Sequence, residues 1–248
     1  MIGVILQARM GSSRLPGKVL MKINGLTSIE FQINRIKQAK RVNKIILATT
    51  DEAQDDPIEE LCQLNDILVF RGSENDVLER YYECAKIHNL STIVRLTADC
   101  PLVDPKIIDI AINEFLKNKV DYCSNTVPPE SSQWPDGSDV EVFSFCALEA
   151  AFSEAKTKED REHVTFYFWK NNLKKFKTHQ ISNYKDWSNY RYTIDYPEDY
   201  EAVKLIVKEL YIDNKIEFTT EDIIGLLEQR SDIVNLNNQF SFGEGWTQ

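Results

Sequence analysis

The feature that most constrains the fold is an alternation of apolar runs and amphipathic segments over the first 120 residues. Apolar runs at 2–6, 45–48 and 67–70, together with the segment Thr92–Leu96, have the length and β-branched content of buried strands. Helical spacing of apolar residues lies between them, in segments that begin near Ile29, Pro57, Asp76 and Pro105. This alternation predicts an α/β fold with a mainly parallel central sheet covered by helices on both faces.

The second half of the chain is less regular. A turn-rich stretch at 125–138 precedes expected strands at 139–143, 176–181 and 191–194, and expected helices at 146–155, 161–170, 197–210 and from 219 onward. No low-complexity linker interrupts the chain, so we expect a single domain over 1–248 with a small inserted subregion. Its parts are a ligand-binding half at 1–124, an inserted subregion at 125–190, and a strand with C-terminal helices at 191–248.

Charge and cysteine content narrow the classes of partner. The chain has 29 Lys and Arg against 39 Asp and Glu, a net charge of −10, which disfavours non-specific binding to nucleic acid or anionic lipid. Five dispersed cysteines without a CxxC pair fit reduced thiols, and three histidines form no zinc pattern. The apolar N-terminus is too short for a signal peptide, and no apolar run is long enough to span a membrane. We therefore expect a cytoplasmic protein.

The loop that follows the first strand carries the strongest functional signal. It reads QARMGSSRLPGK over 7–18, with two glycines that permit close backbone approach and with cations at Arg9, Arg14 and Lys18. Amide donors and cations together suit a triphosphate, although a surface loop with solvated charges is the alternative. The loop is not a Walker A sequence, because five residues separate Gly11 from Gly17 and Val19 follows the lysine.

Two aspartates end expected strands. Asp99 follows the run 92–96, and Asp195 follows 191–194. Open α/β sheets present ligand groups at the carboxyl ends of their strands, and two carboxylates there can share one Mg²⁺. The alternatives are a helix N-cap before Pro197 for Asp195 and a plain turn residue for Asp99.

Several ordered segments together resemble the sugar cytidylyltransferases, which activate acidic sugars such as KDO and sialic acid. The resemblance is nearest to the spore coat polysaccharide biosynthesis cytidylyltransferase-like group and covers nearly the whole chain. Ala98 stands where that family usually has glycine. The matching segments are 7–20, 70–73, 97–102 (TADCPL), 136–143 (DGSDVEVF), 161–164 (REHV) and 193–199 (TIDYPED).

The resemblance implies a Rossmann-like, three-layer nucleotide-diphospho-sugar transferase fold and an Mg²⁺-dependent reaction. In that reaction CMP is transferred from CTP to an acidic sugar or sugar phosphate, and pyrophosphate is released. Asp99 and Asp195 would hold the metal, and Arg9 and Lys18 would complete the catalytic set. The implied nucleotide-binding residues are Gln7, Ala8, Arg9, Gly11, Ser12, Arg14, Lys18, Thr49, Asp51, Arg71, Gly72 and Ser73, and the implied acceptor-binding residues are Asp136, Asp139, Arg161 and His163.

Alternatives remain for several of these residues. Arg71 reads equally as a surface cation, Asp136 and Asp139 as solvated turn acids, and His163 as a packing histidine. Trp134 is a candidate for stacking on a sugar. The resemblance also implies a homodimer, for which the aromatic-rich segment 140–176 is the candidate interface, unless its aromatic residues at 166–169 belong to the chain's own core.

Two other functions compete with the cytidylyltransferase hypothesis. A glycosyltransferase that uses a nucleotide sugar usually carries an Asp-x-Asp metal motif. No second aspartate lies two residues from Asp99, so this motif is not present there. A non-catalytic nucleotide-binding module is the second competitor, and we would expect it to have lost at least one catalytic residue. All four are present, which disfavours this function: Arg9, Lys18, Asp99 and Asp195. Another nucleoside triphosphate, or a phosphorylated acceptor that is not a sugar, also remains open.

Overall fold

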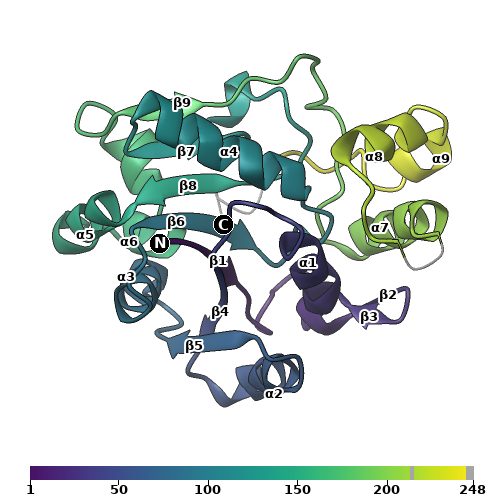
Figure 1. The fold of residues 1–248 in the computed structure, drawn as a ribbon. Coiled ribbons are helices and arrows are strands. Elements are labelled where there is room, and N and C mark those ends of the chain that lie inside the picture. The colour runs from purple at the N-terminus through teal and green to yellow at the C-terminus, as the bar shows by residue number, and fades with distance from the viewer. Residues whose placement is uncertain (213–214, 244–248) are drawn as a thin grey trace.

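Seven strands form the central sheet of the computed structural model, which describes residues 1–212 and 215–243 (Figure 1). The strand order is β5-β4-β1-β6-β8-β7-β9. β5, β4, β1 and β6 are parallel, β8 runs antiparallel to both of its neighbours, and β9 is parallel to β7. The strands are β1 (Ile2–Gln7), β4 (Lys44–Thr50), β5 (Leu68–Gly72), β6 (Thr92–Thr97), β7 (Tyr122–Ser124), β8 (Glu141–Ser144) and β9 (Thr178–Gln180).

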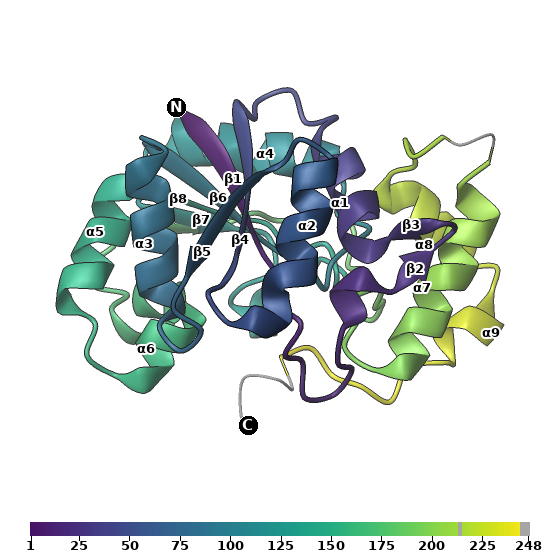
Figure 2. The ribbon, with the colours of Figure 1, turned by 90° about the horizontal axis from the view of Figure 1, so that it is seen from below.

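Helices cover both faces of this sheet. Alternating side chains of β1 explain the layers, because Val4 and Leu6 enter one core and Ile5 enters the other. Residues of α1 (Ser28–Ile36), α2 (Asp56–Leu64) and α4 (Pro105–Asn118) pack in the first core. Residues of α3 (Val77–Ile87) and α5 (Phe145–Glu154) pack in the second, followed in the chain by the short α6 (Lys158–His163). Figure 2 shows α3 and α5 across the sheet from α1 and α2.

A third core lies beside α1. It joins the hairpin of β2 (Lys22–Ile23) and β3 (Leu26–Thr27) to the C-terminal helices α7 (Pro197–Leu210), α8 (Thr220–Leu227) and α9 (Ser231–Val234). The buried Arg35 of α1 ties these parts together by donating hydrogen bonds to the carbonyl oxygens of Val103, Ile216 and Phe218. The C-terminal helices are thereby fixed relative to the sheet.

The expected alternation is confirmed over the first 120 residues, and α7 has the predicted bounds. The strand expected at 191–194 is wrong. One bridge joins Arg191 to Asp136, and the Ile194 amide donates to the Asp99 carbonyl, so the backbone of this segment bonds to loops rather than to a strand.

The continuous helix expected at 161–170 is also wrong. α6 ends at His163, and a π-helical turn follows at Tyr167–Asn171. The break is a γ-turn at Val164, whose φ is 54° and across which the Thr165 amide donates to the His163 carbonyl at 2.5 Å. A positive φ is costly for a β-branched residue, and such strained turns are often found at functional sites.

Several aromatic residues singled out from the sequence are buried. Phe166, Tyr167 and Phe168 are buried in the chain's own interior. Of the two possibilities for these residues, a dimer interface or the chain's own core, the structure therefore favours the core. Trp134 is also buried, and its indole N–H donates to the Ile181 carbonyl oxygen, so its expected role in stacking on a sugar is wrong. No helix in the described ranges 1–212 and 215–243 is long and apolar enough to cross a membrane.

Candidate active site

Two adjoining cavities lie at the carboxyl edge of β1 and β6, where open α/β sheets bind ligands. The loop cavity has a volume of about 300 Å³ and is lined by Gln7, Ala8, Arg9, Ser12, Ser13, Arg14, Lys18, Val19, Thr97, Ala98, Asp99 and Glu162. The inner cavity, of about 250 Å³, shares four of these residues: Gln7, Arg14, Thr97 and Asp99.

The buried Asp55 holds the first loop in place. Its carboxylate accepts the Met10 amide at 2.7 Å, the Thr49 hydroxyl at 2.8 Å, and both the amide and the hydroxyl of Thr50. Burial alone would raise the pKa of Asp55, but these hydrogen bonds outweigh it and the pKa is lowered. Gly17, with φ of 71°, closes the loop by donating its amide to the Met10 carbonyl.

Asp195 lies among three cations. Its Oδ1 is 2.8 Å from both Lys18 Nζ and Arg14 Nη2, and its Oδ2 is 3.5 Å from Arg191 Nη2. Burial would raise the pKa of Asp195, but Lys18, Arg14 and Arg191 together lower it. Arg9, by contrast, is nearly half exposed and lies 3.8 Å from Glu74.

Asp99 and Asp195 converge on the same ammonium group. Lys18 Nζ lies 3.8 Å from Asp99 Oδ2 as well as 2.8 Å from Asp195 Oδ1. The Ile194 amide bonds to the Asp99 carbonyl at 2.7 Å and so holds the two segments together. Two carboxylates aimed at one cation are a donor set that fits Mg²⁺. The residues described contain no preformed group of three or more metal-ligating side chains, so phosphate and water oxygens would supply the other ligands.

Two further acids face the inner cavity because β8 runs antiparallel, which brings the residues before it to the same edge of the sheet. Asp139 accepts the Thr126 hydroxyl at 2.8 Å and the Gly137 amide at 3.0 Å. Burial raises the pKa of Asp139 to about 6 against these hydrogen bonds. Asp136 is paired with Arg191, yet burial and then Asp139 raise its pKa.

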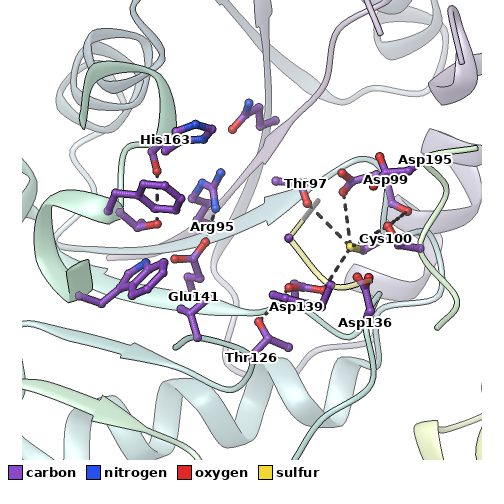
Figure 3. A pocket seen from close by; sticks show the side chains of 18 of the residues that line it. Arg95, Thr97, Asp99, Cys100, Thr126, Asp136, Asp139, Glu141, His163 and Asp195 are labelled. Atoms are coloured by element: carbon purple, nitrogen blue, oxygen red, sulfur yellow. Dashed lines mark hydrogen bonds and ion pairs between the residues drawn. The ribbon is translucent and has the colours of Figure 1, made fainter. Parts of the chain in front are cut away.

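A buried thiol links the acids. Cys100 Sγ lies 3.4 Å from Asp99 Oδ1 and 3.6 Å from Asp139 Oδ2, and in Figure 3 it stands between them. Burial, followed by Asp99 and Asp139, raises the pKa of Cys100, so the thiol stays protonated and can donate to either carboxylate.

The opposite end of the inner cavity is built around an ion pair that the sequence analysis missed. Arg95 of β6 is directly paired in register with Glu141 of β8, their side chains form a salt bridge, and Tyr122 donates its hydroxyl to Glu141. The Nε of Arg95 is buried without a hydrogen-bond partner among the residues that the structure describes. His163 stacks on Phe166 at 4.4 Å, and burial lowers the pKa of this histidine. Figure 3 shows Arg95, Glu141 and His163 on one side of the cavity and the aspartates around Cys100 on the other.

The structure brings many of the predicted site residues together. The loop cavity contains Gln7, Ala8, Arg9, Ser12, Arg14, Lys18 and Asp99, and the inner cavity contains Asp136, Asp139, His163 and Asp195. Gly11 belongs to the same loop, where an added Cβ would lie 3.3 Å from Gln54 Nε2.

Seven predicted residues line neither cavity, namely Gly11, Thr49, Asp51, Arg71, Gly72, Ser73 and Arg161. The guanidinium of Arg71 contacts Asp56 and Glu59 on α2. Arg161 pairs with Asp76 and donates to the Phe152 carbonyl. Arg95, rather than Arg161, is the arginine at the far end of the inner cavity.

The fold and the paired cavities define a nucleotidyltransferase of Rossmann-like fold. A family model described as cytidylyltransferase matches residues 3–232, and the chain belongs to that family. This membership removes the support for a glycosyltransferase.

Relatives match over most of the chain. An uncharacterized protein of Methanocaldococcus jannaschii is 39% identical, covering 96% of this chain and 94% of that protein. The spore coat polysaccharide biosynthesis protein SpsF of Bacillus subtilis is 32% identical, covering 92% of this chain and 94% of SpsF. A cytidylyltransferase structure from Leptospira borgpetersenii has a TM-score of 0.88 and 37% identity, covering 94% of this chain and 96% of that one.

Proposed function

We propose that this protein transfers CMP from CTP to an acidic sugar or sugar phosphate, releases pyrophosphate, and depends on Mg²⁺. The observation that carries this proposal is the convergence of Asp99 and Asp195 on Lys18, at the junction of a cationic loop cavity and a second cavity of polar character. Membership of the cytidylyltransferase family supports CTP as the donor. Supply of activated sugars for surface glycans fits the likeness to SpsF.

The loop residues bind and orient the triphosphate. Arg9, Arg14 and Lys18 provide positive charge in a chain whose net charge is −10. Lys18, whose ammonium lies 2.8 Å from Asp195 Oδ1, would neutralise charge that develops on the leaving pyrophosphate. Gln7, Ala8, Gly11 and Ser12 complete the loop. We place the base near the ends of β4 and β5, at Thr49, Asp51, Arg71, Gly72 and Ser73.

Mg²⁺ bound by Asp99 and Asp195 would neutralise phosphate charge and lower the pKa of the attacking hydroxyl. The protein positions that hydroxyl against the α-phosphorus. A bond forms between the acceptor oxygen and the α-phosphorus while the bond from that phosphorus to the bridging oxygen breaks. An attacking sugar hydroxyl gives up its proton to solvent, whereas a sugar phosphate attacks with an ionised phosphate oxygen that carries no proton, and in both cases pyrophosphate leaves with the bonding electrons.

The acceptor occupies the inner cavity in this proposal. Asp136 and Asp139 bind its hydroxyl groups near the reacting end. At the other end, the Arg95–Glu141 pair and His163 contact its remote substituents. Because Arg161 is paired with Asp76, its contribution to the acceptor site is indirect, through the position of α6 and His163.

The test is pyrophosphate release from each of the four ribonucleoside triphosphates with Mg²⁺ and a panel of acceptors. The panel contains 3-deoxy-manno-octulosonate, its 8-amino-3,8-dideoxy counterpart, N-acetylneuraminate, simple sugar phosphates and phosphorylated alcohols. We expect CTP to be preferred and the product mass to equal acceptor plus CMP. A preference for GTP would contradict the cytidylyl assignment, and a product from a phosphorylated alcohol alone would contradict the sugar acceptor.

We also propose that the protein acts in the cytoplasm as a homodimer. Light scattering at micromolar concentration tests the dimer, and a monomeric mass would contradict it. The interior position of Phe166, Tyr167 and Phe168 means that a dimer interface must use other residues of 140–176.

A further inference from the structure

The last described residues run alongside the inner cavity. Leu236 packs against the third core, and Phe242, six residues later, packs against the second core. Phe242 and Gly243 line the inner cavity together with His163 and Trp169. In Figure 2 the yellow C-terminal segment passes from α9 toward the purple first loop. We call residues 237–243 the C-terminal strap.

Two anchors hold the strap next to the metal-site aspartate. Asn237 is buried and its side-chain amide donates to Asp199 Oδ1 at 2.8 Å. The other oxygen of Asp199 accepts the backbone amides of Asp195 and Tyr196 at 3.0 Å each. Phe240 is the second anchor, because its ring stacks on Tyr196 with centroids 3.9 Å apart and an interplanar angle of 6°.

Tyr196 in turn contacts the first loop. The guanidinium carbon of Arg14 lies 5.0 Å from the centre of the Tyr196 ring, and Arg14 Nη2 is 2.8 Å from Asp195 Oδ1. An unbroken series of contacts therefore runs from Phe240 through Tyr196 to Arg14 and Asp195. An aromatic stack restricts the positions of the residues it joins, and a cation over a ring adds a smaller attraction.

We propose that Phe240 and Phe242 make the C-terminal strap a functional neighbour of the substrate site. Phe240 is a positioning residue that acts through Tyr196 on Arg14 and Asp195. Phe242 is a wall of the inner cavity and contacts the acceptor. The roles given to nucleotide and acceptor rest on the proposed function, whereas the coupling between strap and loop is a property of the fold alone.

Hydrogen exchange without nucleotide tests the coupling. In Phe240→Ala we expect the amides of 9–18 and 195–199 to exchange several-fold faster, and Phe240→Tyr, which keeps the ring, to restore the rates. Gln239→Ala is the matched control, because this neighbouring side chain is exposed. Unchanged exchange of the first loop in Phe240→Ala would overturn the coupling whether or not the protein uses CTP.

Steady-state kinetics then separate the two aromatic residues. With the nucleotide that the wild type uses best, Phe240→Ala should raise its KM about three- to tenfold, as expected for loss of one aromatic stack, with a smaller change in kcat. Phe242→Ala should raise the KM of the acceptor and leave that of the nucleotide unchanged. Normal KM values in both variants of an active enzyme would overturn the strap proposal alone. A wild type that releases no pyrophosphate from any nucleotide would overturn the proposed function. The hydrogen-exchange experiment would still test whether the C-terminal strap is coupled to the first loop.

Discussion

The loop cavity and the far end of the inner cavity are built in different ways. The loop cavity takes most of its lining from one short stretch of chain, 7–19, which follows a single strand. The far end of the inner cavity brings together Arg95, Glu141 and His163, which come from three elements far apart in the sequence. A contiguous site can be recognised as a motif, whereas a dispersed site exists only once the sheet has paired.

The electrostatics of the two regions differ as well. Arg14 and Lys18 in the loop cavity are two cations that share the one carboxylate of Asp195, and their side chains are 21% and 12% exposed. Arg95 and Glu141 form a one-to-one pair whose side chains are 17% and 8% exposed, so loss of either leaves the other charge without its counterion. We therefore expect substitutions in the first region to alter turnover, and substitutions in the second region to alter stability first.

The largest effect is expected for Asp99→Asn in the region where the cavities meet. Loss of one of two converging carboxylates should slow pyrophosphate release roughly 10³-fold, a size typical of lost electrostatic stabilisation at a reacting centre. The melting temperature should change little, because Asp99 is partly exposed. Asp66→Asn is the control, since Asp66 is exposed and its φ of 54° suits asparagine. Wild-type turnover in Asp99→Asn would exclude Asp99 as a metal ligand.

Arg95→Met tests the buried pair. It should lower the free energy of unfolding by about 3–5 kcal/mol, because Glu141 is left buried without its partner. Arg71→Met breaks a more exposed ion pair of α2 and should cost about 1 kcal/mol or less. Urea denaturation measures both. Equal losses would mean that the pair at the far end of the cavity is as well solvated as the one at the surface.

A glycine comparison tests the turn that carries the two inner acids. Gly137 has a φ of 105°, and an added Cβ would lie 2.5 Å from the backbone nitrogen of Thr193. Gly137→Ala should therefore lower the free energy of unfolding by about 2–3 kcal/mol and displace Asp139. Gly25→Ala, at a φ of 91° but with no atom of the described residues within 4 Å of the added Cβ, should cost only about 1 kcal/mol. A smaller loss at Gly137 than at Gly25 would refute the close approach of this turn to residues 192–193.

A smaller effect than those of Arg95→Met and Gly137→Ala is expected for Asp55→Asn beneath the first loop. Loss of the charge that accepts the Met10 amide and the threonine groups should cost about 2 kcal/mol at pH 7. Because the folded-state pKa of Asp55 is lowered, its contribution is complete above the unfolded value of about 4 and is lost as pH falls through the folded-state pKa. Urea denaturation at a series of pH values should show wild type and variant converging in acid. A constant difference down to pH 2 would contradict this role.

Local patterns predicted the fold where each element has a strong signal of its own. β1, β4, β5 and β6 each contain a mainly apolar, β-branched stretch, and α7 begins at Pro197 in an allowed first-turn position. The predictions at 161–170 and 191–194 were wrong because tertiary contacts decide those segments. In the first, the break lies at Val164, a residue whose type gives no warning of a positive φ.

The candidate site follows the same division. The first loop and Asp99 were predicted from their place after a strand. Arg95 and Glu141 were missed, although an arginine between Val94 and Leu96 in an otherwise buried strand is a signal that a partner must lie opposite. The partner is Glu141, and it is identified only by the antiparallel pairing of β8 with β6, which cannot be predicted from the sequence pattern. Arg161 was selected by resemblance, and its ion pair with Asp76 depends on how α6 packs against α3.

The reversed direction of β8 also bears on how this scaffold can diversify. Because β7 and β8 are antiparallel neighbours, the stretch at 125–140 begins and ends at the same rim of the sheet. Insertions or exchanges within that hairpin connection can therefore reshape the recognition surface while the register of β6 with β1 stays as it is. Under the proposed function, new acceptor preferences would arise by replacing this one connection while the first loop is kept unchanged.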